Sequence, residues 1–309
     1  MRAASASAGA LRDSQWDPFG GVKRIRIPRI LSSALSCLCL AILGNSAGAQ
    51  NRELTSWVFG SGSPVVVVLH GGPGVGHSYL LPEWKQLEEV FTVVFYDQRG
   101  CGENAGFPGP YSWQQHISDL DALIRHHRRG RPVVLAGSSW GAGLALLHGL
   151  EGTEEIAGII VSGFVGWMGK QSTPDHLLAR LDSLERGLPV DPWPEPDTLS
   201  SGHGIGGHVA DSIVLARVVD PANPRSISDV FDSRTSMPSQ KELAGLKTPV
   251  LIISGDRDGR HYDAGGHLAK ILQHAERMII RNAVHDPWAA DPKAFFGAVA
   301  DFLKGLGLS

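Results

Sequence analysis

The sequence predicts an α/β protein with a mostly parallel central sheet flanked by helices. Short apolar runs of strand length recur along the chain, at residues 64–71, 91–97, 131–137, 156–163, 248–256 and 276–282. These runs lack the polar and apolar alternation of half-exposed strands, which is typical of strands buried on both faces. Helix-like segments alternate with the runs, and this order favours a parallel sheet.

The helix-like segments carry apolar stripes at helical spacing. In residues 112–127 the stripe consists of Ile117, Leu120, Leu123 and Ile124. Residues 140–150 and 292–306 have a similar pattern.

One long segment, residues 164–246, breaks the alternation of strands and helices. It contains no clear strand and eight prolines, and it is too long for a plain loop. We therefore expect a mainly helical cap at 164–246, inserted after the sixth strand of a core formed by residues 50–163 and 247–309.

The first 49 residues have the layout of a secretory signal peptide. A basic stretch at 22–29 precedes an apolar, uncharged run of 14 residues at 30–43, and small residues that include Ala47 and Ala49 follow. The alternative is a membrane anchor, but a spanning helix needs roughly 20 apolar residues. We expect cleavage near Ala49, no stable membrane span afterwards, and a secreted or periplasmic protein.

Composition excludes several classes of function. The net charge of −3 gives no reason to expect a nucleic-acid partner, and no phosphate-binding or dinucleotide-binding glycine motif is present. Cys101 is the one cysteine after position 49, so we expect a buried thiol and no internal disulfide. We expect no metal ion, no organic cofactor, and a small-molecule or short-peptide substrate, and the oligomeric state stays open.

The stretch Gly137-Ser138-Ser139-Trp140-Gly141 matches the pattern G-x-S-x-G between an apolar strand and an apolar helix. In that context the pattern is typical of a nucleophile elbow, a tight turn that exposes a serine hydroxyl beside a helix N-terminus. The register assigns the nucleophile to Ser139. The alternative is a glycine-rich turn that serves packing alone.

A serine nucleophile needs a base and an orienting carboxylate, in the chain order Ser, acid, His. Two loops that follow late strands supply them. His285 is the candidate base, and Asp258 is the candidate acid, with Asp256 as the alternative.

The stretch HGGPG, at 70–74, directly follows the first apolar core strand. Glycines there let backbone N–H groups approach a developing oxyanion. We assign one donor to the N–H of Gly72, with Gly71 as the alternative, and the second to the N–H of Trp140. A Gly-Pro turn without a catalytic role is the competing interpretation.

Three motifs together resemble the signatures of the proline iminopeptidase family of α/β hydrolases: HGGPG at 70–74, DQRGCG at 97–102 and GSSWG at 137–141. The resemblance implies an α/β-hydrolase fold with Ser139, Asp258 and His285 as a catalytic triad. It also implies an exopeptidase that removes an N-terminal residue, often proline, beneath a cap.

Acidic cap residues would hold the free amine of such a substrate, and the candidates by charge alone are Glu185, Asp191, Glu195 and Asp197. In the 97–102 motif, we expect Arg99 to pair with Asp97 or to hold neighbouring loops. An esterase or lactonase with the same triad is the alternative function. A ligand-binding protein without catalysis on the same scaffold is a third.

Overall fold

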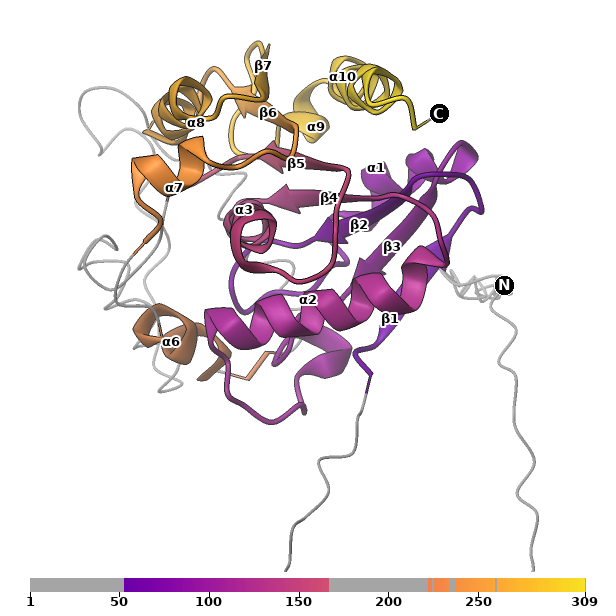
Figure 1. Cartoon of the computed structure of the whole chain (residues 1–309), viewed down its shortest axis with the longest axis vertical. Helices are drawn as coiled ribbons and strands as arrows, with labels where there is room; N and C mark the ends of the chain where they lie inside the picture. The colour runs from indigo at the N-terminus through magenta and orange to yellow at the C-terminus, as the bar shows by residue number, and fades with distance from the viewer. Residues whose placement is uncertain (1–52, 167–221, 224, 234–236, 259, 309) are drawn as a thin grey trace, which may run out of the picture. The chain divides into compact units, whose positions relative to one another are not determined.

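The computed structural model describes residues 53–308, except for 167–221, 224, 234–236 and 259 (Figure 1). The expected signal peptide, most of the expected cap and its four candidate carboxylates lie outside these residues and stay predictions. Within the described ranges, no helix combines the length and the apolar character that crossing a membrane requires.

The described chain is built around a seven-stranded sheet with the spatial order β1-β3-β2-β4-β5-β6-β7. Strand β1 pairs with β3 in antiparallel fashion, and every other pairing is parallel, so the predicted mostly parallel sheet is confirmed. The strands are β1 (Ser56–Phe59), β2 (Val65–Leu69), β3 (Thr92–Tyr96), β4 (Val133–Ser138), β5 (Gly158–Ser162), β6 (Val250–Gly255) and β7 (Ala275–Ile280).

Helices cover both faces of the sheet, because alternate strand residues point to opposite sides. One apolar cluster joins Val65, Val67 and Leu69 to helices α2 (Trp113–Arg128), α3 (Trp140–Glu151) and α8 (Arg260–Ile271). The other joins Val66 and Val68 to α1 (Leu81–Trp84), α9 (Pro287–Ala290) and α10 (Pro292–Gly305). The remaining helical segments of the described residues are η1 (Lys85–Glu89), η2 (Gly102–Asn104), α6 (Arg225–Asp232) and α7 (Gln240–Ala244).

The three helices that the apolar stripes predict are present within about two residues of their expected ends. The Ser112 side chain caps α2 by accepting a hydrogen bond from the backbone N–H of Gln115 at 3.2 Å. The Asp291 side chain caps α10 in the same way, with the N–H of Ala294 as donor. Both caps satisfy N–H groups that have no partner inside the helix.

The segment expected to form the cap follows β5, the fifth strand of the described residues. The described residues at the end of this segment contact the core. The Asn223 N–H donates to the Gly100 carbonyl at 2.7 Å, and the N–H of Trp113 at the start of α2 donates to Ser233 Oγ at 3.1 Å.

Helix α3 packs very closely against strands β2 and β4 at its N-terminal turn. A methyl group at Gly137 would collide with the carbonyl oxygen of Gly141, and one at Gly141 would collide with the carbonyl oxygen of Leu69. Only glycine fits at both positions without moving backbone. The two glycines of the G-x-S-x-G pattern are thus required by the packing of α3 on the sheet.

We predict that Gly141→Ala destabilises the protein by roughly 3 kcal/mol, because the added methyl group forces backbone apart in a close-packed core. The matched control is Gly297→Ala in α10, where a methyl group would meet nothing within 4 Å. That change is expected to stabilise by about 0.5–1 kcal/mol, since alanine restricts the unfolded chain. Urea unfolding of both variants measures the difference, and equal stabilities would contradict the packing argument.

Candidate active site

Ser139 occupies the sharp turn between β4 and α3. Its backbone angles are φ 55° and ψ −116°, a left-handed conformation that costs a non-glycine residue about 1–3 kcal/mol. Ser138, the neighbouring serine, is the last residue of β4 and is only 1% exposed. Ser139 is partly exposed at the carboxyl end of the sheet. The geometry therefore favours Ser139 over Ser138 as a residue that meets a substrate.

Asp258 and His285 form a buried pair. The Nδ1 atom of His285 lies 3.1 Å and 3.3 Å from the two carboxylate oxygens of Asp258, and both residues are less than 5% exposed. Two backbone hydrogen bonds fasten the loops that carry them: Arg257 N–H to the Ala283 carbonyl at 2.9 Å, and Asp256 N–H to the Ile280 carbonyl at 3.1 Å. The side chain of Asp256, the alternative acid, is exposed to solvent.

The environment of His285 favours its protonated form. Burial opposes protonation, but the hydrogen bond from Nδ1–H to Asp258, the charge of Asp258 and the nearby charge of Asp286 outweigh it and raise the pKa of His285. Because a carboxylate only accepts hydrogen bonds, Nδ1 carries the proton in the neutral ring. Nε2 is then the basic nitrogen.

The end of β5 and the turn after it contact both Ser139 and His285. The Ser139 N–H donates to the Ser162 carbonyl at 2.9 Å. The next residue, Gly163, lies against the His285 ring, and a methyl group there would sit 3.2 Å from Cε1. The serine and the imidazole thus flank the same two residues at the carboxyl edge of the sheet.

The loop after β2 approaches Ser139 from the other side. A methyl group on Gly71 would lie 3.1 Å from Cβ of Ser139. The Gly71 N–H already donates to the hydroxyl of Tyr79 at 2.8 Å, so this N–H is a poor donor for a substrate oxygen. Gly72, with φ 118°, remains the donor candidate from this loop, and the N–H of Trp140 is the first of α3.

Tyr79 and Asp286 are site residues that the sequence analysis did not single out. Burial and the charge of Asp286 raise the pKa of Tyr79, so the phenol is neutral. Tyr79 follows the 70–74 motif by five residues and belongs to no motif. Asp286 directly follows His285, and this position is the sequence feature that could have identified it as a site residue.

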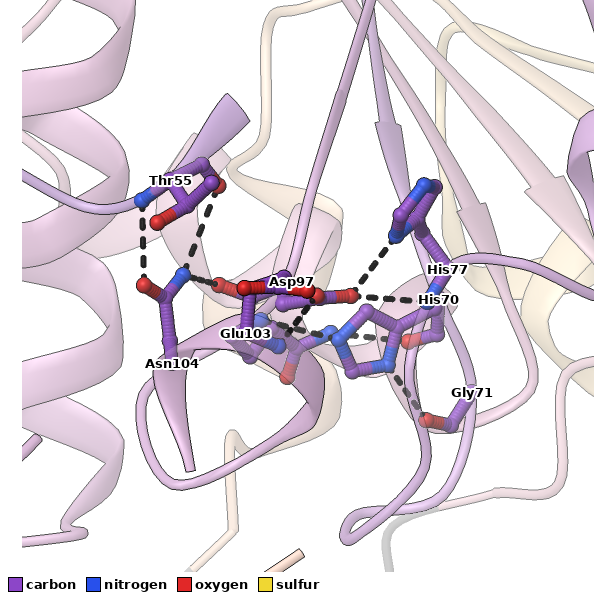
Figure 2. Close-up of polar contacts among 8 residues, drawn as sticks. Thr55, His70, Gly71, His77, Asp97, Glu103 and Asn104 are labelled. Atoms are coloured by element: carbon purple, nitrogen blue, oxygen red, sulfur yellow. Dashed lines mark hydrogen bonds and ion pairs between the residues drawn. The ribbon is translucent and has the colours of Figure 1, made fainter. Parts of the chain in front are cut away.

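The charged residues of the 97–102 motif hold loops, but they do not pair with each other. Figure 2 shows His77 beside Asp97, and the Nδ1 atom of His77 lies 2.8 Å from the Asp97 carboxylate. The same carboxylate accepts hydrogen bonds from the backbone N–H groups of His77 and Glu103. Burial opposes ionisation of Asp97, but the hydrogen bond and charge of His77 lower its pKa. Arg99 instead makes a two-pronged contact with Asp119 on α2, at 2.5 Å and 2.7 Å. The expected Asp97–Arg99 pair is therefore wrong, and the loop-holding alternative describes Arg99.

Cys101 is a buried thiol, as expected. Across the described portion of the chain, no group of three or more His, Cys, Asp or Glu side chains is placed to hold a metal ion.

A mostly parallel sheet, a serine on a strained strand-to-helix turn and a buried acid–histidine pair define an α/β hydrolase. The model of the alpha/beta hydrolase family matches residues 66–298, and the chain belongs to this family.

Among individual proteins, the chain is 39% identical over 164 residues to the proline iminopeptidase of Lactobacillus helveticus, an alignment that covers 49% of this chain and 55% of the relative. It is 36% identical over 103 residues to the proline iminopeptidase of Thermoplasma volcanium, covering 32% of this chain and 34% of the relative. The chain thus spans about half the length, or less, of these two curated relatives.

Solved structures share the fold across most of the chain. MenH from S. aureus superimposes with a TM-score of 0.65 at 18% identity, covering 82% of this chain and 98% of that chain. A thermophilic esterase from Thermogutta terrifontis gives 0.64 at 22% identity, covering 82% and 93%.

We predict that His285 titrates above 6.5 and that Asp258→Asn moves its pKa below the wild-type value, because the favourable charge and the carboxylate acceptor are lost. The imidazole resonances of His285, followed by NMR across pH 5–9, measure both values. Asp256→Asn is the control, since its side chain is exposed. A His285 pKa that responds equally to the two substitutions would contradict the pairing.

Proposed function

We propose that the protein is a serine hydrolase with Ser139 as nucleophile, His285 as base and Asp258 as the orienting acid, acting as an aminopeptidase of the proline iminopeptidase type. The observation that carries the proposal is the strained Ser139 turn beside the buried Asp258–His285 pair. The strained backbone at Ser139 lowers the stability of the folded protein. A function that requires an exposed serine hydroxyl explains why the strain is present.

In this mechanism the Ser139 hydroxyl attacks the substrate carbonyl carbon while Nε2 of His285 takes its proton. The carbonyl oxygen becomes an oxyanion and accepts hydrogen bonds from the N–H groups of Gly72 and Trp140. His285 then gives its proton to the leaving amine, the carbon–nitrogen bond breaks, and an acyl-enzyme ester remains on Ser139. Water, deprotonated by His285, hydrolyses the ester and restores the serine.

The charges of the site suit this cycle. Asp258 and Asp286 both favour the imidazolium that forms when Ser139 loses its proton. Each oxyanion donor is expected to contribute roughly 10²–10³-fold to the rate. The base must be neutral in the free enzyme, so the raised pKa of His285 places the rise of kcat/KM with pH above pH 6.5.

The substrate class rests on the relatives. The Lactobacillus helveticus protein is named a proline iminopeptidase. The motifs at 70–74, 97–102 and 137–141 of this chain resemble the signatures of that family. An amide that follows an N-terminal proline is therefore the proposed substrate. The same triad and oxyanion donors serve esters and lactones equally well, because the tetrahedral intermediate is similar.

We predict that Ser139→Ala lowers kcat on proline β-naphthylamide by at least roughly 10³-fold, since the nucleophile is removed. Ser138→Ala is the matched control and is expected to retain activity within about tenfold, because Ser138 lies inside β4. Release of naphthylamine is followed by fluorescence, and p-nitrophenyl acetate is assayed in parallel.

The two substrates separate the possible functions. Serine-dependent cleavage of the ester alone would retain the triad and replace the aminopeptidase with an esterase. Equal activity of wild type and Ser139→Ala on both substrates, with no labelling of Ser139 by a fluorophosphonate, would overturn the hydrolase proposal.

A further inference from the structure

Gln98 links the loop after β2 to the first residue of α3, the two places that supply the proposed oxyanion donors. Its backbone N–H donates to Nε2 of His70 at 2.9 Å, and its side-chain Nε2 donates to the His70 carbonyl at 2.8 Å. Its side-chain oxygen accepts a hydrogen bond from the Trp140 indole N–H at 2.7 Å. Gln98 belongs to the 97–102 motif, in which the sequence analysis predicted roles for other residues and none for Gln98.

The chemistry of these groups fixes every proton in the network. An indole N–H only donates, so the amide oxygen of Gln98 must face Trp140 and its nitrogen must face His70. A backbone N–H also only donates, so Nε2 of His70 is an acceptor and the ring is neutral. The ring proton is then on Nδ1, which lies 2.9 Å from the Gly71 carbonyl oxygen and donates to it. Figure 2 shows His70 and Gly71 in this contact.

Both ends of this chain of hydrogen bonds reach a proposed oxyanion donor. At one end, Trp140 carries its own backbone N–H at the start of α3. At the other end, the Gly71 carbonyl and the Gly72 N–H belong to the same planar peptide unit. The hydrogen bond from His70 that orients the Gly71 carbonyl therefore also sets the direction of the Gly72 N–H.

Burial makes this arrangement rigid. Gln98 is 1% exposed, His70 is 0% exposed and Trp140 is 2% exposed, so water is poorly placed to replace a broken contact. Aromatic packing holds the Trp140 ring as well, with the Trp113 ring centroid 3.8 Å away and the His116 centroid 5.9 Å away. The network thus has one arrangement of donors and acceptors.

We infer that Gln98 is a positioning residue that aligns the Gly72 and Trp140 N–H groups toward the oxyanion, acting through His70 and the Trp140 indole. This inference rests on the proposed serine-hydrolase function. Misaligned donors weaken binding of the oxyanion, which exists in the transition state and not in the substrate, so the effect falls on kcat more than on KM.

The experiment compares Gln98→Leu with Asp121→Ala, on whichever of the two substrates the wild type turns over through Ser139. Asp121 is a buried control on α2, whose carboxylate lies 2.8 Å from Nε2 of His148 and accepts hydrogen bonds from the backbone N–H groups of Thr153 and Glu154. We predict that Gln98→Leu lowers kcat by roughly 10²-fold, as for loss of one oxyanion donor, while KM changes less than about threefold. Asp121→Ala is expected to lower Tm and leave kcat per folded molecule unchanged.

Gln98→Glu provides a second readout that a merely structural role would not change. A protonated glutamic acid reproduces both side-chain bonds, because its carbonyl oxygen accepts from Trp140 and its hydroxyl donates to His70. An ionised glutamate loses the donor and sets a negative oxygen against the His70 carbonyl. The ratio of kcat for Gln98→Glu to kcat for wild type is therefore expected to fall as pH rises, while circular dichroism shows both proteins folded.

The outcomes separate this inference from the function on which it rests. If Ser139→Ala retains wild-type activity, the proposed function is overturned, and so is the role of Gln98 that depends on it. If activity depends on Ser139, but Gln98→Leu loses no more kcat than Asp121→Ala or changes only KM, the positioning role alone is overturned. If infrared spectroscopy shows the introduced carboxyl ionising within the pH range, and the ratio for folded Gln98→Glu does not change, the inference is also overturned. That test holds even where Gln98→Leu fails to fold.

Discussion

The close approach of helix α3 to the ends of β2 and β4 is the constraint on which the candidate site depends. Backbone meets backbone at Gly137 and Gly141, so there is no room for a side chain at either position. This packing compresses the strand-to-helix connection into a single residue and holds Ser139 at φ 55°. The same packing sets the first turn of α3, which begins with the proposed donor Trp140, against the carbonyls of Leu69 and His70, and the loop that follows them contains the other proposed donor, Gly72.

The parallel arrangement of the strands explains how the other residues of the candidate site come to lie at one edge of the sheet. Because their carboxyl ends share one edge, loops that are far apart in sequence converge without long connections. The Asp258–His285 pair then needs only two backbone hydrogen bonds between the loops after β6 and β7 to be fixed. The turn at Ser162 and Gly163 completes the edge, since it holds the Ser139 N–H and packs against the His285 ring. The apolar side chains of the strands form the two core clusters, and the candidate site lies at this carboxyl edge.

The sequence predicts those features that local pattern encodes. Apolar runs locate β2 to β7, and apolar stripes locate α2, α3 and α10, because burial and periodicity are properties of neighbouring residues. Ser139, Asp258 and His285 follow from chain order and stay predictions, although the structure brings them to one edge. The partners of Asp97 and Arg99 were not predictable: each pairs with a residue 20 positions away, His77 and Asp119, and that choice depends on how loops pack in three dimensions. Tyr79 was missed for the same reason.

The buried His70–Gln98–Trp140 chain is hard to explain by stability alone. Satisfied hydrogen bonds in a core contribute a net stabilisation of only about 1 kcal/mol each, and apolar groups of the same shape are often as stable. A polar chain differs from an apolar one in that it has a direction: each donor must face its acceptor. Here the direction runs from the indole of Trp140 to the carbonyl of Gly71, whose peptide plane includes the Gly72 N–H. A site that stabilises an oxyanion needs oriented N–H groups, and the polar chain supplies that orientation while the apolar layers on both sides of the sheet supply the stability.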